Sequence, residues 1–283
     1  MRTNRIHHLA AAGLVVTVGL SAAAVLTPVA APAVPGVTTK TVTVTVGSRS
    51  FPARLSYPAR GGPYPVLAFA HGYTARASWY ASTLDALARA GIVVIAPDSE
   101  TGVAANHSRF ADDLNRSLAW LVSQSRAGST VVPRGKVDAS RTGVAGHSMG
   151  GAAALLAAAR SRTVDTVATL AALPTPEAAA AVRRLKVASL FVVGSNDRLI
   201  PAADTASIFR RAPAPSLLAS ITGGSHCGFQ DEVPPACDPR GRISYPRQHA
   251  LTLEQLRRWL ERYLKGTPGT RVTGVQGISY TQR

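Results

Sequence analysis

A serine between closely spaced glycines is the clearest candidate for chemistry in this sequence. It lies in the run Gly146-His147-Ser148-Met149-Gly150-Gly151, which contains the pattern Gly-x-Ser-x-Gly. This pattern is typical of a nucleophile elbow, where a strand turns sharply into a helix and holds the serine hydroxyl clear of the sheet. The flanking segments fit this geometry, because residues 141–145 are expected to form a buried strand and the Ala- and Leu-rich residues 152–160 a helix. The alternative is a glycine-rich turn that only packs a helix on a sheet.

A serine hydroxyl needs a neighbouring base to act as a nucleophile at neutral pH. Two later positions supply a base and an acid in the chain order Ser…Asp…His. Asp197 follows a predicted buried strand at 187–193, and His226 follows the last clear core strand at 216–221. We therefore predict that His226 accepts the Ser148 proton and that Asp197 orients the imidazole.

Other titratable residues are weaker candidates for these roles. Asp98 also follows a strand end and is the alternative acid. We expect the His147 side chain to point away from that of Ser148. We expect His107 and His249 to be solvated. Asp231 and Glu232 follow His226 too closely to orient it and are interpreted as loop charges.

Acyl transfer also requires N–H groups that stabilise a developing oxyanion. The Met149 N–H, at the start of the predicted helix, is one candidate. The second is expected in the loop after an early buried strand, 65–70, which reads His71-Gly72-Tyr73-Thr74. We predict the Tyr73 N–H as this donor and its ring as one wall of the acyl pocket. Simple loop packing is the alternative for Tyr73.

Alternating strands and helices surround these residues and must position them. An edge strand is predicted at 38–46 with a hairpin partner at 51–57, and buried strands are predicted at 65–70 and 92–96. Helices are predicted at 79–90, 110–121, 201–211 and 251–264. This alternation predicts one α/β domain over residues 38–265, with a mainly parallel sheet flanked by helices. Residues 266–283 are interpreted as a polar tail with little packing signal.

The N-terminus resembles a secretory signal peptide. A basic start is followed by an apolar run from Leu9 to Leu26 and a small-residue site at Ala31-Pro32-Ala33. We therefore predict that residues 1–33 are removed and that the protein is secreted to the extracellular space. A membrane anchor is the alternative, but the prolines near the predicted site favour cleavage and no stable membrane insertion afterwards.

Cysteine content and charge add two further expectations. In an exported chain the only cysteines, Cys227 and Cys237, can form a disulfide; a cysteine nucleophile is the alternative. The formal net charge is +16, and no nucleic-acid motif accompanies it. We interpret the charge as a solvated basic surface suited to an anionic environment, with no nucleic-acid partner. No spacing of His or Cys predicts a metal site, and no cofactor is expected.

Four motifs together resemble the bacterial cutinase and polyester-hydrolase family, including the poly(ethylene terephthalate) hydrolases: 72–76, 135–138, 146–151 and 223–226. The resemblance runs from about Thr38 to about Lys265. It implies an α/β-hydrolase fold without a lid domain, and ester hydrolysis. Ser148, Asp197 and His226 match the family's triad, and Tyr73 and Met149 match its oxyanion pair.

The sequence departs from the family pattern in two places. Family members often carry a tryptophan about two dozen residues after the nucleophile, whereas this region reads Leu173-Pro174-Thr175-Pro176. The segment after His226 is longer and is more similar to dienelactone-hydrolase and lipase relatives. We include Thr175, with Tyr73 and Met149, among the expected substrate-binding residues. The missing tryptophan favours aliphatic over aromatic polyesters.

The sequence thus predicts a serine esterase, a monomer, that acts on short-chain esters and on polyesters. Two alternatives stay open. One is a small-ester or lipase-type hydrolase without polymer activity. The other is a catalytically silent hydrolase fold that binds an envelope polymer through its basic surface.

Overall fold

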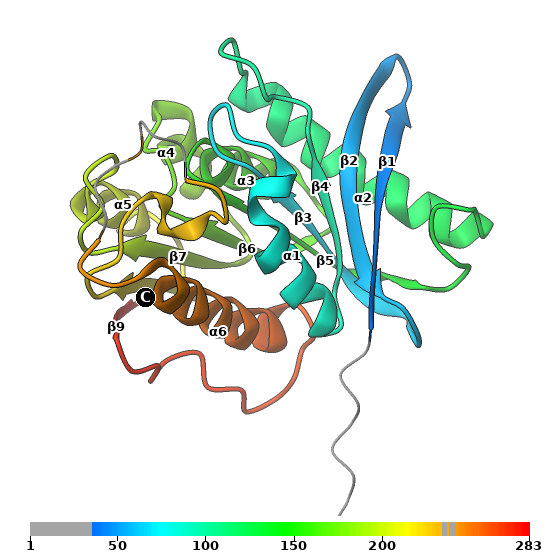
Figure 1. Cartoon of the computed structure of the whole chain (residues 1–283). Coiled ribbons are helices and arrows are strands. Elements are labelled where there is room, and N and C mark those ends of the chain that lie inside the picture. The colour runs from blue at the N-terminus through cyan, green and yellow to red at the C-terminus, as the bar shows by residue number, and fades with distance from the viewer. Residues whose placement is uncertain (1–35, 234–236, 238–240) are drawn as a thin grey trace, which may run out of the picture. The chain divides into compact units, whose positions relative to one another are not determined.

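A nine-stranded sheet is the centre of the part of the chain that the computed structural model describes, residues 36–233, 237 and 241–283 (Figure 1). The strand order is β1-β2-β4-β3-β5-β6-β7-β8-β9. The pairs from β4–β3 to β7–β8 are parallel, and β1, β2 and β9 run antiparallel to their neighbours. The predicted signal peptide, 1–33, lies outside the described residues.

The strands are β1 Val37–Val46, β2 Arg49–Pro58, β3 Tyr64–Ala70, β4 Val93–Pro97, β5 Val137–His147, β6 Val164–Leu170, β7 Ala188–Gly194, β8 Ser216–Ile221 and β9 Ile278–Gln282. The α-helices are α1 Ala81–Arg89, α2 His107–Ala127, α3 Met149–Arg160, α4 Pro176–Val182, α5 Ala202–Phe209 and α6 Tyr245–Tyr263, and the 3₁₀ helices are η1 Ala77–Tyr80 and η2 Cys227–Phe229. None of the described helices combines the length and hydropathy needed to cross a membrane.

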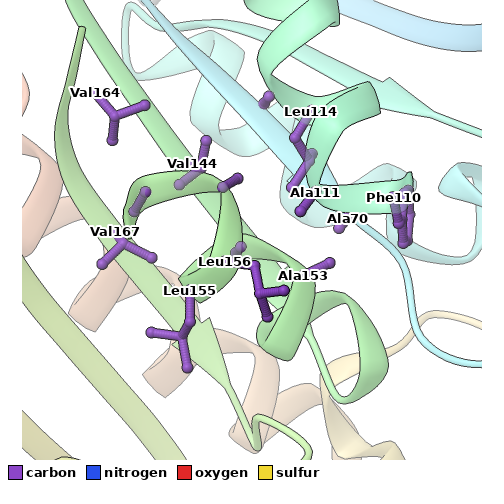
Figure 2. Packing of buried hydrophobic residues seen from close by; sticks show 14 of the residues in the cluster. Ala70, Phe110, Ala111, Leu114, Val144, Ala153, Leu155, Leu156, Val164 and Val167 are labelled. Atoms are coloured by element: carbon purple, nitrogen blue, oxygen red, sulfur yellow. The ribbon is translucent and has the colours of Figure 1, made fainter. Parts of the chain in front are cut away.

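Helices cover both faces of the sheet, so each buried strand contributes alternate side chains to two cores. In β3, Val66 and Ala68 pack into the core formed with α2 and α3. Leu67 and Phe69 of the same strand pack into the core formed with α1 and α6. Figure 2 shows the first core, with the alanines and leucines of α3 lying beside strand valines. The fold class predicted from the sequence, an α/β-hydrolase fold with a mainly parallel sheet, is confirmed.

Strand β6 is an element that the sequence patterns did not indicate. Its residues include Thr166 and Thr169, which are fully buried. Their hydroxyls donate to the carbonyl oxygens of Ala188 and Leu190 on β7, at 2.9 and 3.2 Å. These bonds satisfy the polar groups inside the sheet, so a strand with polar residues can occupy a central position.

The C-terminal segment differs from the expected polar tail. Its last residues form β9, which pairs antiparallel with β8 and closes that edge of the sheet. Val275 and Ile278 are buried in the core that contains Leu251 of α6. A five-residue strand with only two core-facing positions, Ile278 and Tyr280, carries too little periodicity to be recognised from sequence.

Adjacent residues of β9 should therefore differ in how much their substitution destabilises the protein. Ile278→Ala removes buried apolar area and should lower the free energy of unfolding by about 2 kcal/mol. Ser279→Ala, at the neighbouring exposed position, should change it by less than about 0.5 kcal/mol. Urea denaturation of the two variants measures the difference, and equal effects would contradict a packed β9.

Candidate active site

The backbone at Ser148 adopts a conformation that side chains rarely occupy, with φ 56° and ψ −119°. It joins the end of β5 to the start of α3. Glycines make this turn possible, because a Cβ on Gly146 would collide with the Gly150 carbonyl oxygen. A Cβ on Gly150 would collide with the carbonyl oxygens of Ala70 and His71. The predicted elbow geometry is therefore present at Ser148.

The loop after β3 lies beside this turn. A Cβ built on Gly72 would lie 3.7 Å from the Ser148 Cβ, so the next residue, Tyr73, begins close to the serine. Met149 reaches Ser148 from the other side as the first residue of α3. Met149 is only 2% exposed, and its thioether packs in the core that α3 shares with α2.

The Tyr73 ring, in contrast, stands in solvent with 54% of its surface exposed. Its hydroxyl donates to the Val103 carbonyl oxygen at 3.0 Å, which connects the loops that follow β3 and β4. Val103 and Leu199 are also exposed apolar side chains on loops that leave strands. The ring is therefore available to contact a substrate at this edge.

Asp197 and His226 are brought together from the loops after β7 and β8. The His226 Nδ1 lies 2.8 Å from Asp197 Oδ2, and both side chains are buried. The other oxygen, Oδ1, accepts the N–H groups of Leu199 and Ile200 at 3.0 and 2.7 Å. Both carboxylate oxygens are thus paired, which fixes the orientation of the carboxylate toward the imidazole.

The backbone before His226 is clamped by a glutamine that the sequence analysis missed. Gln248 of α6 is fully buried and accepts the Ser225 N–H at 2.9 Å. Its amide donates to the Ser225 carbonyl at 2.8 Å. The Cys227–Cys237 disulfide, with a Cα–Cα distance of 6.3 Å, constrains the chain on the other side of His226, as predicted.

A second hydrogen-bonded chain runs behind the site through His147. The Gly72 N–H donates to the Tyr80 hydroxyl oxygen at 3.0 Å, and this oxygen lies 2.8 Å from His147 Nδ1. The His147 Nε2 lies 3.2 Å from the His226 carbonyl oxygen, and the two imidazole rings are 4.7 Å apart. His147 therefore connects the loop that precedes Tyr73 to the backbone of His226.

Protonation states follow from the partners in this chain. Burial lowers the pKa of His147 well below its usual range, and the nearby His226 lowers it further, so the ring is neutral. A carbonyl oxygen only accepts, so the single proton lies on Nε2 and points at the His226 carbonyl. The Tyr80 hydroxyl, whose pKa is raised by burial, then donates to Nδ1.

Other residues considered from the sequence have structural partners elsewhere. Asp98, the alternative acid, accepts the Ala77 N–H at 2.6 Å at the start of η1. Asp231 is exposed on its loop, as expected, and there it accepts the Ser82 N–H at 2.8 Å and also the Ser82 hydroxyl. His107 and His249 are half-buried, and the latter's Nε2 lies 2.9 Å from the Gln230 carbonyl oxygen.

Thr175, which we expect to contact substrate, also has a structural role. Its hydroxyl accepts the Ala178 N–H at 3.1 Å and caps the N-terminus of α4. The residue of this loop that reaches the elbow is Leu173, whose N–H donates to the Ser148 carbonyl oxygen at 2.9 Å. Among the described residues, no three His, Cys, Asp or Glu side chains gather closely enough to hold a metal ion.

The hydroxyl of Tyr80 can be tested by a one-atom deletion. Tyr80→Phe leaves the buried Gly72 N–H and the His147 Nδ1 without this partner, which costs roughly 1–3 kcal/mol of stability. Because both connected loops relax, kcat on a soluble ester should fall on the order of tenfold with little change in KM. Tyr64→Phe, whose hydroxyl donates only to the exposed Arg60 carbonyl, is the matched control. An unchanged kcat for Tyr80→Phe would contradict a positioning role.

Burial of neutral histidines also predicts a pH effect on stability. Burial lowers the pKa values of His147 and His71 from the ordinary 6.5, so the unfolded chain binds these protons first as the pH falls. The free energy of unfolding is therefore unaffected by the titration of these histidines above about pH 6.5. Below that pH it falls, by up to about 1.4 kcal/mol per pH unit for each of the two histidines. Urea unfolding between pH 7.5 and 5 measures the slope. In His147→Gln the free energy of unfolding should depend less steeply on pH. An unchanged pH dependence would contradict a neutral, buried His147.

Comparison with known proteins connects this geometry to a family. A family model described as PET hydrolase-like matches residues 22–231. Cutinase est1 of Thermobifida alba is 39% identical over 99 residues, 35% of this chain and 32% of that protein. A cutinase of Thermobifida fusca (strain YX) is 38% identical over 99 residues, which are 35% of this chain and 31% of that protein. Chlorophyllase-1 of Arabidopsis thaliana is 30% identical over 125 residues, which are 43% of this chain and 37% of that protein.

The aligned regions thus span about a third of the length of these curated relatives. The family model covers most of the present chain, including the elbow, the Asp197 loop and His226. The chain therefore belongs to the PET hydrolase-like family.

Proposed function

We propose that this chain is a secreted serine esterase that hydrolyses carboxylic esters through an acyl-enzyme at Ser148. The observation that carries the proposal is the 2.8 Å contact between His226 and Asp197, together with the 4.7 Å distance between the rings of His226 and His147, the residue that precedes Ser148 in the glycine-supported elbow. Family membership supports the same chemistry. The hydrogen bond of Asp98 to Ala77 supports Asp197 as the acid of the triad.

The reaction has two stages in this arrangement. The Ser148 oxygen attacks the ester carbonyl carbon while His226 Nε2 takes the hydroxyl proton, and the N–H groups of Tyr73 and Met149 stabilise the oxyanion. The tetrahedral intermediate collapses, and the alcohol leaves with the proton held by His226. A water molecule then attacks the acyl-enzyme with His226 as base, and the carboxylic acid is released as Ser148 recovers its proton.

The substrate class follows from the surface around the serine. The described loops that leave the strands contain the short helices η1 and η2 and no separate lid. Tyr73, Val103 and Leu199 expose apolar surface at this edge, which suits an acyl chain lying along the protein. The relatives named cutinase, and a family named for PET hydrolysis, agree with a polyester. We infer activity on short-chain esters and aliphatic polyesters, and weaker activity on aromatic polyesters.

Secretion is supported by two independent features. The apolar N-terminal run with its small-residue site has the composition of a signal peptide. A disulfide is typical of proteins that reach an oxidising compartment. The protein would then act as a monomer outside the cell, without a cofactor or nucleic acid.

Paired substitutions distinguish the two candidate acids. Asp197→Asn should lower kcat on a soluble ester on the order of 10⁴-fold, because the amide favours the wrong imidazole tautomer. Asp98→Asn should keep kcat within about tenfold, since its carboxylate only caps η1. Ser148→Ala and His226→Ala should lose about as much activity as Asp197→Asn or more. The reverse ranking of the two aspartates would overturn the assignment.

The Tyr73 ring predicts a size-dependent substrate effect. Tyr73→Ala keeps the backbone N–H but removes the exposed ring, so KM should rise several-fold for long acyl chains and little for acetyl esters. Tyr73→Phe, which removes only the bond to Val103, is the control and should resemble wild type. A panel of esters of increasing chain length and one aliphatic polyester film measure the effect. A preference for long-chain triglycerides with interfacial activation would contradict a lid-free site.

A further inference from the structure

A row of exposed basic residues lies at one edge of the sheet. The segments that lead into the six parallel strands are 59–63, 89–92, 128–136, 161–163, 183–187 and 210–215, and they contain no aspartate or glutamate. Arg184 lines a hollow with Glu177 and His107 and is left out. The other exposed basic residues of these segments are Arg60, Arg89, Arg134, Arg162, Arg183, Lys186, Arg210 and Arg211. We call this set the basic edge.

The topology places these residues side by side although they are scattered in the sequence. The amino ends of parallel strands meet at the same edge, and β4, β3, β5, β6, β7 and β8 are consecutive neighbours. Arg283 also belongs to the basic edge. Because β9 runs antiparallel to β8, the end of β9 lies beside the start of β8, and the Arg283 carbonyl oxygen accepts the Ser216 N–H at 3.0 Å. At about 4.8 Å per strand, the row is on the order of 30 Å long.

Most of this charge is not neutralised by neighbours. Two carboxylates lie at the amino ends of β5 and β6: Asp138 pairs with Arg141, and Asp165 accepts the Thr142 N–H. Lys265 pairs with Glu261. Within residues 36–233, 237 and 241–283, no carboxylate forms an ion pair with Arg162, Lys186 or Arg211. A row of like charges that repel one another is a cost to the fold, and a bound polyanion would remove it.

The opposite edge, which holds the candidate active site, has a different charge. The described loops that leave the parallel strands carry the acidic residues Asp98, Glu100, Asp197, Asp231 and Glu232, and the basic residues Arg76, Arg198 and Arg242. The charged residues of the described loops are therefore distributed asymmetrically between the two edges of the sheet.

We propose that the basic edge binds a linear polyanion that carries phosphate groups, and that the active-site edge stays open when it is bound. Arginine predominates in the row, and its planar guanidinium binds phosphate through two parallel hydrogen bonds. A row of this length fits an extended polymer better than a single small anion. The proposal is independent of the proposed ester hydrolysis.

The distribution of apolar side chains favours a polymer over a lipid surface. The large exposed apolar residues among those described are Tyr73, Val103, Leu199 and Val233, all on loops that leave strands. The basic edge has none of them, whereas segments that lie on membranes combine basic residues with apolar anchors.

Long-chain inorganic polyphosphate is the probe for this proposal. Binding to the full chain is measured by fluorescence anisotropy at 50 and 200 mM NaCl, and the affinity should fall steeply with salt. The test variant combines Arg162→Gln, Lys186→Gln and Arg211→Gln. The control variant combines Arg76→Gln, Arg242→Gln and Arg271→Gln, which removes the same charge from other exposed positions.

The edge variant should bind polyphosphate at least tenfold more weakly than wild type, and the control variant less than threefold more weakly. Saturating polyphosphate should leave wild-type turnover of a soluble ester unchanged; if the protein has no esterase activity, the binding comparison still tests the edge. Equal losses in the two variants would show that only net charge matters and would overturn the proposal. Binding to phosphatidylglycerol vesicles without binding to polyphosphate, or inhibition of turnover by polyphosphate, would also overturn it.

Discussion

The close approach of backbone segments around Ser148 is the constraint on which the site depends. The serine occupies a strained turn because the backbone of α3 lies directly against the end of β5 and the loop after β3. Only glycine fits at Gly146 and Gly150, since a Cβ at either position would collide with a carbonyl oxygen. The same contact places the loop that contains Tyr73 next to the serine. The strained backbone at Ser148 and the proximity of the loop after β3 thus have one steric origin.

Polar side chains buried beneath the site connect its separate loops. Asp197 holds His226 from β7, Gln248 holds the preceding residue from α6, and His147 joins the His226 carbonyl to Tyr80 and the Gly72 loop. Each of these groups is buried, so an unmade bond would leave a polar atom without water. The geometry of the imidazole therefore depends on the whole network, and the neutral form of His147 is part of it.

The sequence predicted features that depend on local patterns and missed those that depend on distant partners. The elbow was predictable because its glycines are neighbours in sequence, and the buried strands because apolar runs are local signals. Tyr80 and Gln248 were not, since nothing near them in sequence shows that they face Gly72 and Ser225. The cap that Thr175 forms on α4 was not predicted either, because the helix itself was not. The pairing of β9 with β8 is likewise non-local.

The central claim, that His226 and Asp197 make Ser148 a nucleophile, is tested most directly by covalent labelling. A fluorophosphonate transfers its phosphonyl group to an activated serine and releases fluoride, so the adduct marks the nucleophile. Mass spectrometry of the digested protein should find one stoichiometric adduct, on the peptide that contains Ser148. The labelling rate should fall by several orders of magnitude in His226→Ala. An unlabelled Ser148 in folded protein, or an adduct on another serine, would contradict the account.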